Sequence, residues 1–434
     1  MGGAVPNKPT TDFQRHPWMN HVIWGWRLEI ALGLATVVAL EIARSVSPIA
    51  PWTLGIVLLV LLRANDSIRH RALTRLRVAQ RERTLQAIFW RCAVIGRDGE
   101  LPTVKSVSLI PTGWRYLLML PIGLHLGSIE GRLDELAAAL NARSVRVRPW
   151  SGGSRYVEFI VMTGDPFRVQ VRSLLVGRDQ DTLWEPISIG VGEDGRLVSI
   201  ALPEHNLLIG GEPGSGKSVA LSNIVAAAAL DPRAHVTLLD GKEVELSVWR
   251  DIAEDFVGSS LSDALVALEG LRATMETRYR HLADSRRRKI GEDDIDGLHV
   301  LVIDELALYL RGGERVARDR FAELLRDLVA RGRAAGIVVV AATQKPSHEI
   351  VPTWIRDLFS YRLAMRCTNP DASDTILGQG WASQGYNAAT IDSAKRGVGL
   401  LLAEGGVPRL VRVPYLADDE IDQIAQRAFR LRAS

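Results

Sequence analysis

The chain has 434 residues, of which 47% are apolar and 24% are charged, so it is long enough for two or three domains and too apolar to be a disordered chain. Its net charge is only +3, which by itself indicates no class of partner. Its two cysteines, Cys92 and Cys367, lie far apart and lack CxxC spacing. This argues against a disulfide scaffold and against a zinc site, and it fits a reducing compartment.

Residues 1–21 form an N-terminal tail, and residues 22–62 predict a two-helix transmembrane hairpin. The uncharged run 46–62 nearly reaches the roughly 20 residues that cross a bilayer. The run 30–40 does so only if the glutamates at its ends lie at the two interfaces. A buried soluble hairpin is the alternative. A signal peptide is disfavoured because no small-residue cleavage site follows a single apolar region.

Arginines crowd residues 63–95, which predicts a basic juxtamembrane helix. By the positive-inside rule this helix faces the cytoplasm, so we expect a multi-pass protein of the cell membrane whose remaining domains are cytoplasmic. Contact with anionic lipid is the first expectation for these arginines, and DNA contact is the alternative.

Two further domains follow in chain order. Residues 96–180 combine alternating apolar residues with one stretch of helical spacing, which predicts a small α+β domain for positioning. In residues 181–434 strands and helices alternate, which predicts an α/β domain built on a parallel sheet with helices on both faces.

The stretch GEPGSGKS, residues 211–218, matches the phosphate-loop pattern between an apolar strand and a helix. Its glycines let backbone N–H groups surround an anion, and the next helix directs its N-terminus at the same phosphates. We expect Lys217 to reach the β- and γ-phosphates of ATP and Ser218 to ligate Mg²⁺. The expected nucleotide contacts are Gly211, Glu212, Pro213, Gly214, Ser215, Gly216, Lys217, Ser218 and Val219.

A buried strand at 300–303 ends in Asp304 and Glu305, at the strand end where α/β sites lie. Asp304 is expected to join Ser218 in the magnesium shell, and Glu305 to polarise water. This pairing indicates a hydrolase rather than a kinase. The alternative is a pair of solvated carboxylates at a strand end.

A third apolar strand runs into Thr343, Gln344 and Lys345. Gln344 is placed to sense the γ-phosphate or to orient water, and a plain loop amide is the alternative. Upstream, Arg331 and Arg333 fit either an arginine finger acting on a neighbouring subunit or helix C-terminal cations that meet the dipole. The residues alone favour the second interpretation.

Several stretches together resemble, in order over residues 205–402, the FtsK/SpoIIIE family of DNA-pumping motors. They are the phosphate loop, the acidic strand, the sensor strand, LLDGKEVELSVW, METRYRHLA and YRLAMRCTNPDASDTILGQG. The hairpin and the small domain make the build most similar to actinobacterial conjugative-transfer (Tra-type) members. The resemblance implies a RecA-like P-loop motor that hydrolyses ATP with Mg²⁺ as a homo-hexamer around double-stranded DNA.

The resemblance also implies roles for single residues. It makes Gln344 the sensor and Arg333 the arginine that acts in trans. It places Thr343, Lys345 and Arg356 where they would grip DNA phosphates without reading sequence. Two departures stand out. Lys345 replaces an arginine that is common in the family, and the next pore loop has Pro370 and Asp374 at positions that are often basic.

The predicted function is a membrane-anchored, ATP-driven translocase of double-stranded DNA that moves plasmid or integrative-element DNA in conjugation. The alternatives are a type VII-like protein-secretion ATPase, a chromosome-segregation DNA pump and a non-hydrolysing membrane scaffold. After the last family-like stretch the chain is too short for a winged-helix reader, so any sequence-directed loading is expected from a separate DNA-recognition or transfer protein.

Overall fold

The computed structural model describes residues 80–168, 170–179, 182–294 and 297–433, together with 37–38, 41–42 and 45. The tail at 1–21, nearly all of the predicted hairpin at 22–62 and the start of the basic segment lie outside these residues. The described remainder of the basic segment is helical over 80–91. Within the described parts of the chain, no helix combines the length and the apolar character needed to cross a bilayer.

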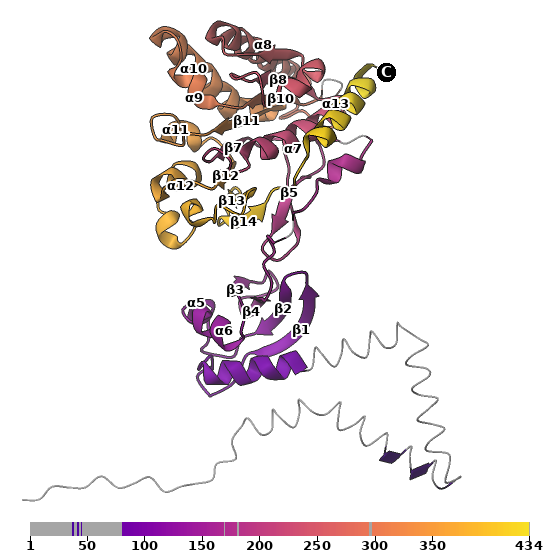
Figure 1. The fold of residues 1–434 in the computed structure, drawn as a ribbon, viewed down its shortest axis with the longest axis vertical. Coiled ribbons are helices and arrows are strands. Elements are labelled where there is room, and N and C mark those ends of the chain that lie inside the picture. The colour runs from indigo at the N-terminus through magenta and orange to yellow at the C-terminus, as the bar shows by residue number, and fades with distance from the viewer. Residues whose placement is uncertain are drawn as a thin grey trace, which may run out of the picture. The chain divides into compact units, whose positions relative to one another are not determined.

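The chain divides into two compact units, Met1–Gly164 and Asp165–Ser434 (Figure 1). The first unit contains a four-stranded antiparallel sheet in the order β1-β2-β4-β3, with the two short helices α5 and α6 and the helix 80–91. Its elements are β1 (Thr103–Ile110), β2 (Gly113–Met119), α5 (Leu126–Glu130), α6 (Leu133–Ala139), β3 (Ser144–Pro149) and β4 (Tyr156–Met162). Phe89 of the helix packs edge-on against Phe159 of β4, with ring centroids 5.3 Å apart, so helix and sheet share one core.

The second unit is organised by a ten-stranded sheet in the order β6-β5-β14-β13-β12-β7-β11-β10-β8-β9. The strands are β5 (Ile187–Gly192), β6 (Leu197–Ile200), β7 (Leu207–Gly210), β8 (His235–Leu239), β9 (Asp255–Val257), β10 (His299–Ile303), β11 (Ile337–Thr343), β12 (Tyr361–Met365), β13 (Val398–Leu402) and β14 (Arg409–Arg412). From β12 to β9 all pairings are parallel, whereas β13, β14, β5 and β6 add antiparallel pairings. The predicted parallel sheet is confirmed at the centre, and the sheet as a whole is mixed. Short connections such as 403–408 explain the difference, because they can join only antiparallel strands.

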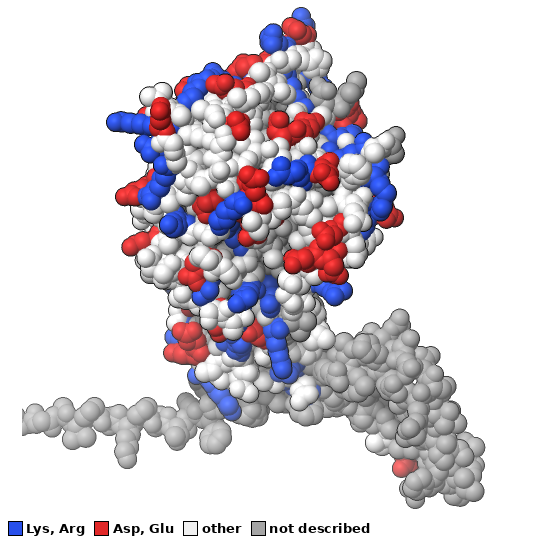
Figure 2. All heavy atoms as spheres, turned by 45° about the horizontal axis from the view of Figure 1, so that its top comes forward, with Lys and Arg blue, Asp and Glu red and all other residues white. Residues whose placement is uncertain are grey.

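Helices cover both faces of this sheet, as predicted (Figure 1). One face carries α7 (Lys217–Leu230), η2 (Ser247–Ile252) and α13 (Asp418–Ala433). The other carries α8 (Leu261–Asp284), α9 (Leu306–Arg311), α10 (Arg315–Arg331), α11 (Thr353–Arg356) and α12 (Pro370–Leu377). The short 3₁₀ turns are η1 (Leu174–Gly177), η3 (Gly332–Ala335), η4 (Ala382–Gln384) and η5 (Ala388–Thr390). On the face seen in Figure 2, basic and acidic side chains are interspersed.

The strand order brings three loops to one edge of the sheet. β11 lies between β7 and β10, with Thr343 paired to Gly210 and Ala341 paired to Ile303. Because parallel strands end at the same edge, the chain leaves β7, β10 and β11 side by side. The phosphate loop, the acidic pair and the sensor therefore meet at this edge.

Candidate functional site

The phosphate loop joins β7 to α7 through two glycines with left-handed backbone. Gly214 has φ 76° and Gly216, the residue before α7, has φ 106°. A Cβ at Gly216 would also lie 2.7 Å from Cα of Gly397, whose N–H donates to the Ser215 carbonyl at 2.9 Å. A side chain at Gly216 would therefore clash with the backbone of Gly397, which cannot move aside as a flexible side chain could.

The lysine of this loop is paired with the first acid of β10. Lys217 Nζ lies 2.9 Å from Oδ1 and 3.2 Å from the main-chain oxygen of Asp304. Both side chains are buried, with 4% and 0% of their surface exposed. Asp304 Oδ2 is buried and accepts no hydrogen bond from any residue that the structure describes. A buried carboxylate oxygen without a hydrogen bond is energetically costly unless a cation or a donor binds to it. Lys217 and Asp304 together therefore suit a ligand that contains both phosphate and Mg²⁺.

Glu305 is held by groups at the end of β11. Its Oε1 accepts from the Thr343 hydroxyl at 2.8 Å and from the Ala307 N–H at 3.3 Å. Its Oε2 accepts from the Gln344 N–H at 3.0 Å. The acidic strand and the sensor strand are thus linked directly.

A cavity of about 630 Å³ opens beside the phosphate loop. Its walls include most of the residues predicted for the nucleotide, namely Glu212, Pro213, Gly214, Gly216, Lys217, Ser218 and Val219, together with Gln344. Gly211 and Ser215 are buried and do not line it, and the Ser215 hydroxyl has no hydrogen-bond partner in the described part of the chain. The predicted residues therefore converge on one cavity large enough for a nucleotide.

Sequence reasoning missed half of this cavity. The remaining wall residues are Gln170, Lys242, Glu245, Arg396, Gly397, Arg412, Val413 and Tyr415. Lys242 and Glu245 belong to the loop after β8, which the buried Asp240 carboxylate organises by accepting from three backbone N–H groups. The sequence of that loop resembles the family, but its residues alone indicate no role in binding. Of the other six residues, five lie in or next to the antiparallel strands β13 and β14, and Gln170 lies before β5. No local sequence motif marks any of these residues.

A further missed contact ties the phosphate loop to β12. Arg366, directly after β12, lies 2.6 Å from the Glu212 carboxylate, and its carbonyl accepts from the Glu212 N–H at 2.9 Å. Both side chains are about three-quarters buried. The loop that follows β12 is therefore connected to the nucleotide cavity.

Arg333 lies away from this cavity. It belongs to η3, which precedes the amino end of β11, whereas Gln344 follows the carboxyl end. A strand of this length spans roughly 20 Å. Arg333 donates to the Glu204 carbonyl, lies 3.8 Å from Glu404 and lines a separate cavity of about 290 Å³. Arg333 is therefore not part of the wall of the phosphate-loop cavity.

The three residues predicted to contact DNA differ in exposure. Lys345 is exposed, whereas Thr343 is 0% exposed and holds Glu305. Arg356 is 5% exposed and donates to Asp357 at 2.9 Å. In this conformation only Lys345 offers its charge to a phosphate.

The two departures in the next loop have structural roles. Pro370 is at the first turn of α12, where its missing N–H costs nothing. The Asp374 carboxylate accepts from the N–H groups of Gly380 at 2.9 Å and Ala382 at 2.8 Å. Both residues shape the fold here.

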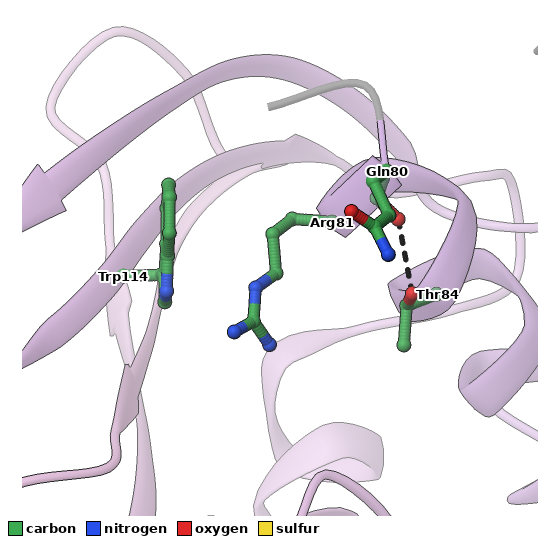
Figure 3. A pocket seen from close by; sticks show the side chains of 4 residues that line it. All are labelled: Gln80, Arg81, Thr84 and Trp114. Atoms are coloured by element: carbon green, nitrogen blue, oxygen red, sulfur yellow. Dashed lines mark hydrogen bonds between the residues drawn. The ribbon is translucent and has the colours of Figure 1, made fainter. Parts of the chain in front are cut away.

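The first unit has its own small cavity of about 450 Å³, lined by Gln80, Arg81, Thr84 and Trp114 (Figure 3). The guanidinium of Arg81 lies 5.4 Å from the Trp114 ring centroid, a cation–π contact. This set holds no acid or base for catalysis. In the described ranges, no three His, Cys, Asp or Glu side chains are grouped as metal ligands. The phosphate-loop cavity is therefore the chemical centre of the described chain.

Comparisons with known proteins agree with this centre. The model of the FtsK/SpoIIIE family matches residues 170–376. The DNA translocase FtsK of Bacillus anthracis is 28% identical over 348 residues, covering 74% of this chain and 42% of the relative. The DNA translocase SpoIIIE of Bacillus subtilis (strain 168) is 27% identical over 346 residues, with the same coverage of 74% and 42%. The chain thus spans less than half the length of these curated relatives.

Among solved structures, the pCW3 conjugation coupling protein TcpA, a monomer form with ATPγS, matches with a TM-score of 0.53 and 19% identity. The match covers 81% of this chain and 99% of TcpA, and it shows a shared fold. The cytoplasmic domain of the Thermomonospora curvata type VII secretion ATPase EccC matches with a TM-score of 0.45 and 19% identity, over 61% and 33% of the two chains. The matched residues 170–376 contain the phosphate loop, the acidic strand and the sensor, so the chain carries an FtsK/SpoIIIE domain over just under half of its length.

Proposed function

We propose that this protein is a membrane-anchored, ATP-driven translocase of double-stranded DNA. The observation that carries the proposal is the convergence of Lys217, Asp304, Glu305 and Gln344 at one sheet edge, within a family domain. The exposed Lys345 lies two residues after the end of β11, whose last residue, Thr343, donates a hydrogen bond to Glu305. Gln344, which would orient water for hydrolysis, and Lys345, which would contact DNA, are thus neighbours in the chain.

In the proposed cycle, Lys217 leaves Asp304 and binds the β- and γ-phosphates of ATP. Ser218 and the unpartnered Asp304 Oδ2 would hold Mg²⁺, which when bound neutralises charge on the phosphates. Such a site needs few protein ligands, because Mg²⁺ keeps waters and phosphate oxygens in its shell. Glu305 accepts the proton of the attacking water, and Gln344, on the cavity wall, orients that water.

The proposal includes a homo-hexameric ring. It is supported by the position of Arg333, which lies beyond the reach of its own nucleotide cavity and would complete a neighbour's site. Lys345 would face the pore and hold phosphates without reading sequence, so DNA affinity should fall with rising salt.

Membrane anchoring and a role in conjugation are further parts of the proposal. The apolar runs within 22–62 support an anchor, with the motor domain in the cytoplasm. The resemblance of the overall build to conjugative-transfer members supports plasmid or integrative-element DNA as the cargo. A separate DNA-recognition or transfer protein would then select that DNA.

The test is ATP turnover by the purified full chain in detergent, with and without long duplex DNA. We expect turnover that duplex DNA stimulates, and that Lys217→Ala and Glu305→Gln abolish. Displacement of a third strand from a triplex by the wild type, but not by Glu305→Gln, would show movement along DNA. Turnover that duplex DNA leaves unchanged would overturn the translocase and favour a protein-secretion ATPase.

A further inference from the structure

The carboxylate of Glu305 accepts three hydrogen bonds from its own chain. Thr343 donates to Oε1 at 2.8 Å, and the N–H groups of Ala307 and Gln344 donate at 3.3 Å and 3.0 Å. Glu305 is also not among the side chains that line the nucleotide cavity. A general base must lie within about 2.6–3.2 Å of the proton that it takes. In this arrangement Glu305 does not line the cavity, so its carboxylate must turn before it can accept a proton from water there.

The Thr343 hydroxyl has a second partner. It accepts from the N–H of Lys345 at 3.2 Å while it donates to Glu305. Thr343 is fully buried, so water does not compete for the hydroxyl. One short chain of hydrogen bonds thus runs from the backbone of the exposed Lys345 to the carboxylate. Such networks transmit a change at one end because each bond orients the next.

We propose that Thr343 is a positioning residue that holds Glu305 in a resting arrangement until DNA displaces the backbone at Lys345. This inference rests on the proposed function, because it names the regulation of that same site. When a phosphate draws Lys345 away, its N–H no longer orients the Thr343 hydroxyl, and Glu305 turns toward the cavity. Gln344 contributes from the nucleotide side, since its side chain lines the cavity while its N–H holds Oε2.

The opposite role makes a different prediction. If Thr343 held Glu305 in its working position, loss of the hydroxyl would slow hydrolysis under all conditions. A restraint instead predicts faster hydrolysis without DNA and little further gain with DNA. The two roles therefore differ in the sign of the change in the DNA-free rate.

The test uses the full chain and three variants at one position. Thr343→Val keeps the shape and removes the hydroxyl, Thr343→Ala removes it without a branched side chain, and Thr343→Ser keeps it as the matched control. For each variant, kcat and KM for ATP are measured with and without long duplex DNA, and thermal unfolding checks the fold. We expect valine or alanine to raise the DNA-free kcat about tenfold, the effect of one hydrogen bond to a charged acceptor, with KM unchanged. Serine should retain the wild-type stimulation.

Each outcome bears on the inference separately from the proposed function. A DNA-free kcat that falls or stays constant in folded valine and alanine variants, beside a wild type that DNA stimulates, overturns the restraint alone. A raised DNA-free kcat beside a wild type that DNA does not stimulate supports the restraint and overturns its release by DNA together with the translocase. A wild type and variants that all fail to hydrolyse ATP overturn both.

Discussion

The ammonium of Lys217, which lines the phosphate-loop cavity, forms a buried pair with the carboxylate of Asp304, with Nζ 2.9 Å from Oδ1. The pair satisfies the lysine when no phosphate is near. Nucleotide binding must therefore exchange one anionic partner of Lys217 for another, and the exchange leaves Asp304 with both oxygens available to a cation. One residue pair thus links phosphate binding to metal binding.

Lys217→Ala should abolish ATP hydrolysis and also destabilise the fold. Removing one partner of a buried pair typically costs about 3–5 kcal/mol, because the other charge remains buried without compensation. Denaturant unfolding of the purified protein measures this loss. Adding Asp304→Asn to Lys217→Ala should restore most of the stability and none of the activity. Equal unfolding midpoints for wild type and Lys217→Ala would contradict a buried pair.

The two left-handed glycines of the phosphate loop should differ in their tolerance of alanine. Gly214 has φ 76° and open space where a Cβ would lie, so Gly214→Ala costs only backbone strain of about 1–2 kcal/mol. Gly216→Ala adds a contact of 2.7 Å with Cα of Gly397. We expect Gly216→Ala to lose nucleotide binding, measured with a fluorescent ATP analogue, and Gly214→Ala to lose less. A reversed order would show that the loop does not rest on Gly397.

Arg366→Ala should weaken ATP binding with little effect on stability. Its ion pair with Glu212 at 2.6 Å holds the phosphate loop against the end of β12, and the pair is only partly buried. A several-fold rise in KM for ATP is expected, together with a change in the denaturation midpoint within about 1 kcal/mol. Arg409→Ala, at an exposed position of β14, is the matched control and should leave KM unchanged. An unchanged KM in Arg366→Ala would remove Arg366 from the nucleotide site.

Stability should fall in mild acid because of one histidine. Burial, aided by Arg278 and by the stacked His235 ring, lowers the pKa of His299 to about 3 from 6.5. Below pH 6.5 the unfolded chain binds a proton at His299 that the folded chain excludes. The contribution of neutral His299 to the free energy of unfolding is therefore fully present above pH 6.5 and is lost as the pH falls toward 3. At pH 5.5 the loss is about 1.4 kcal/mol relative to neutral pH.

The measurement is the denaturant midpoint at pH 7.5 and at pH 5.5. His299→Gln, which cannot be protonated, should reduce the difference between the two midpoints. His348→Gln, at an exposed position, serves as the control and should leave the difference as in the wild type. A wild-type midpoint that is the same at both pH values would contradict the burial of a neutral His299.

The residues that local patterns singled out lie close together in the structure. The phosphate loop, the acidic strand and the sensor strand each depend on residues within about ten positions of one another, so spacing and strand–helix context were enough to identify them. The family domain at 170–376 confirms that resemblance. The local sequence pattern could not predict that Thr343 and Arg356 are buried, because burial depends on which distant segments of the chain pack against them.

The sequence by itself determined that Lys217 follows a buried strand and a glycine turn and begins a helix, and that acids follow a second buried strand. Only the tertiary structure decided which distant residues complete the cavity. Arg396 and Arg412 line it from positions beside β13 and in β14, and Arg366, directly after β12, pairs with Glu212 of its wall. The physical reason is that strand order, which the chain does not encode locally, places β11 between β7 and β10 and so joins Thr343 to Glu305.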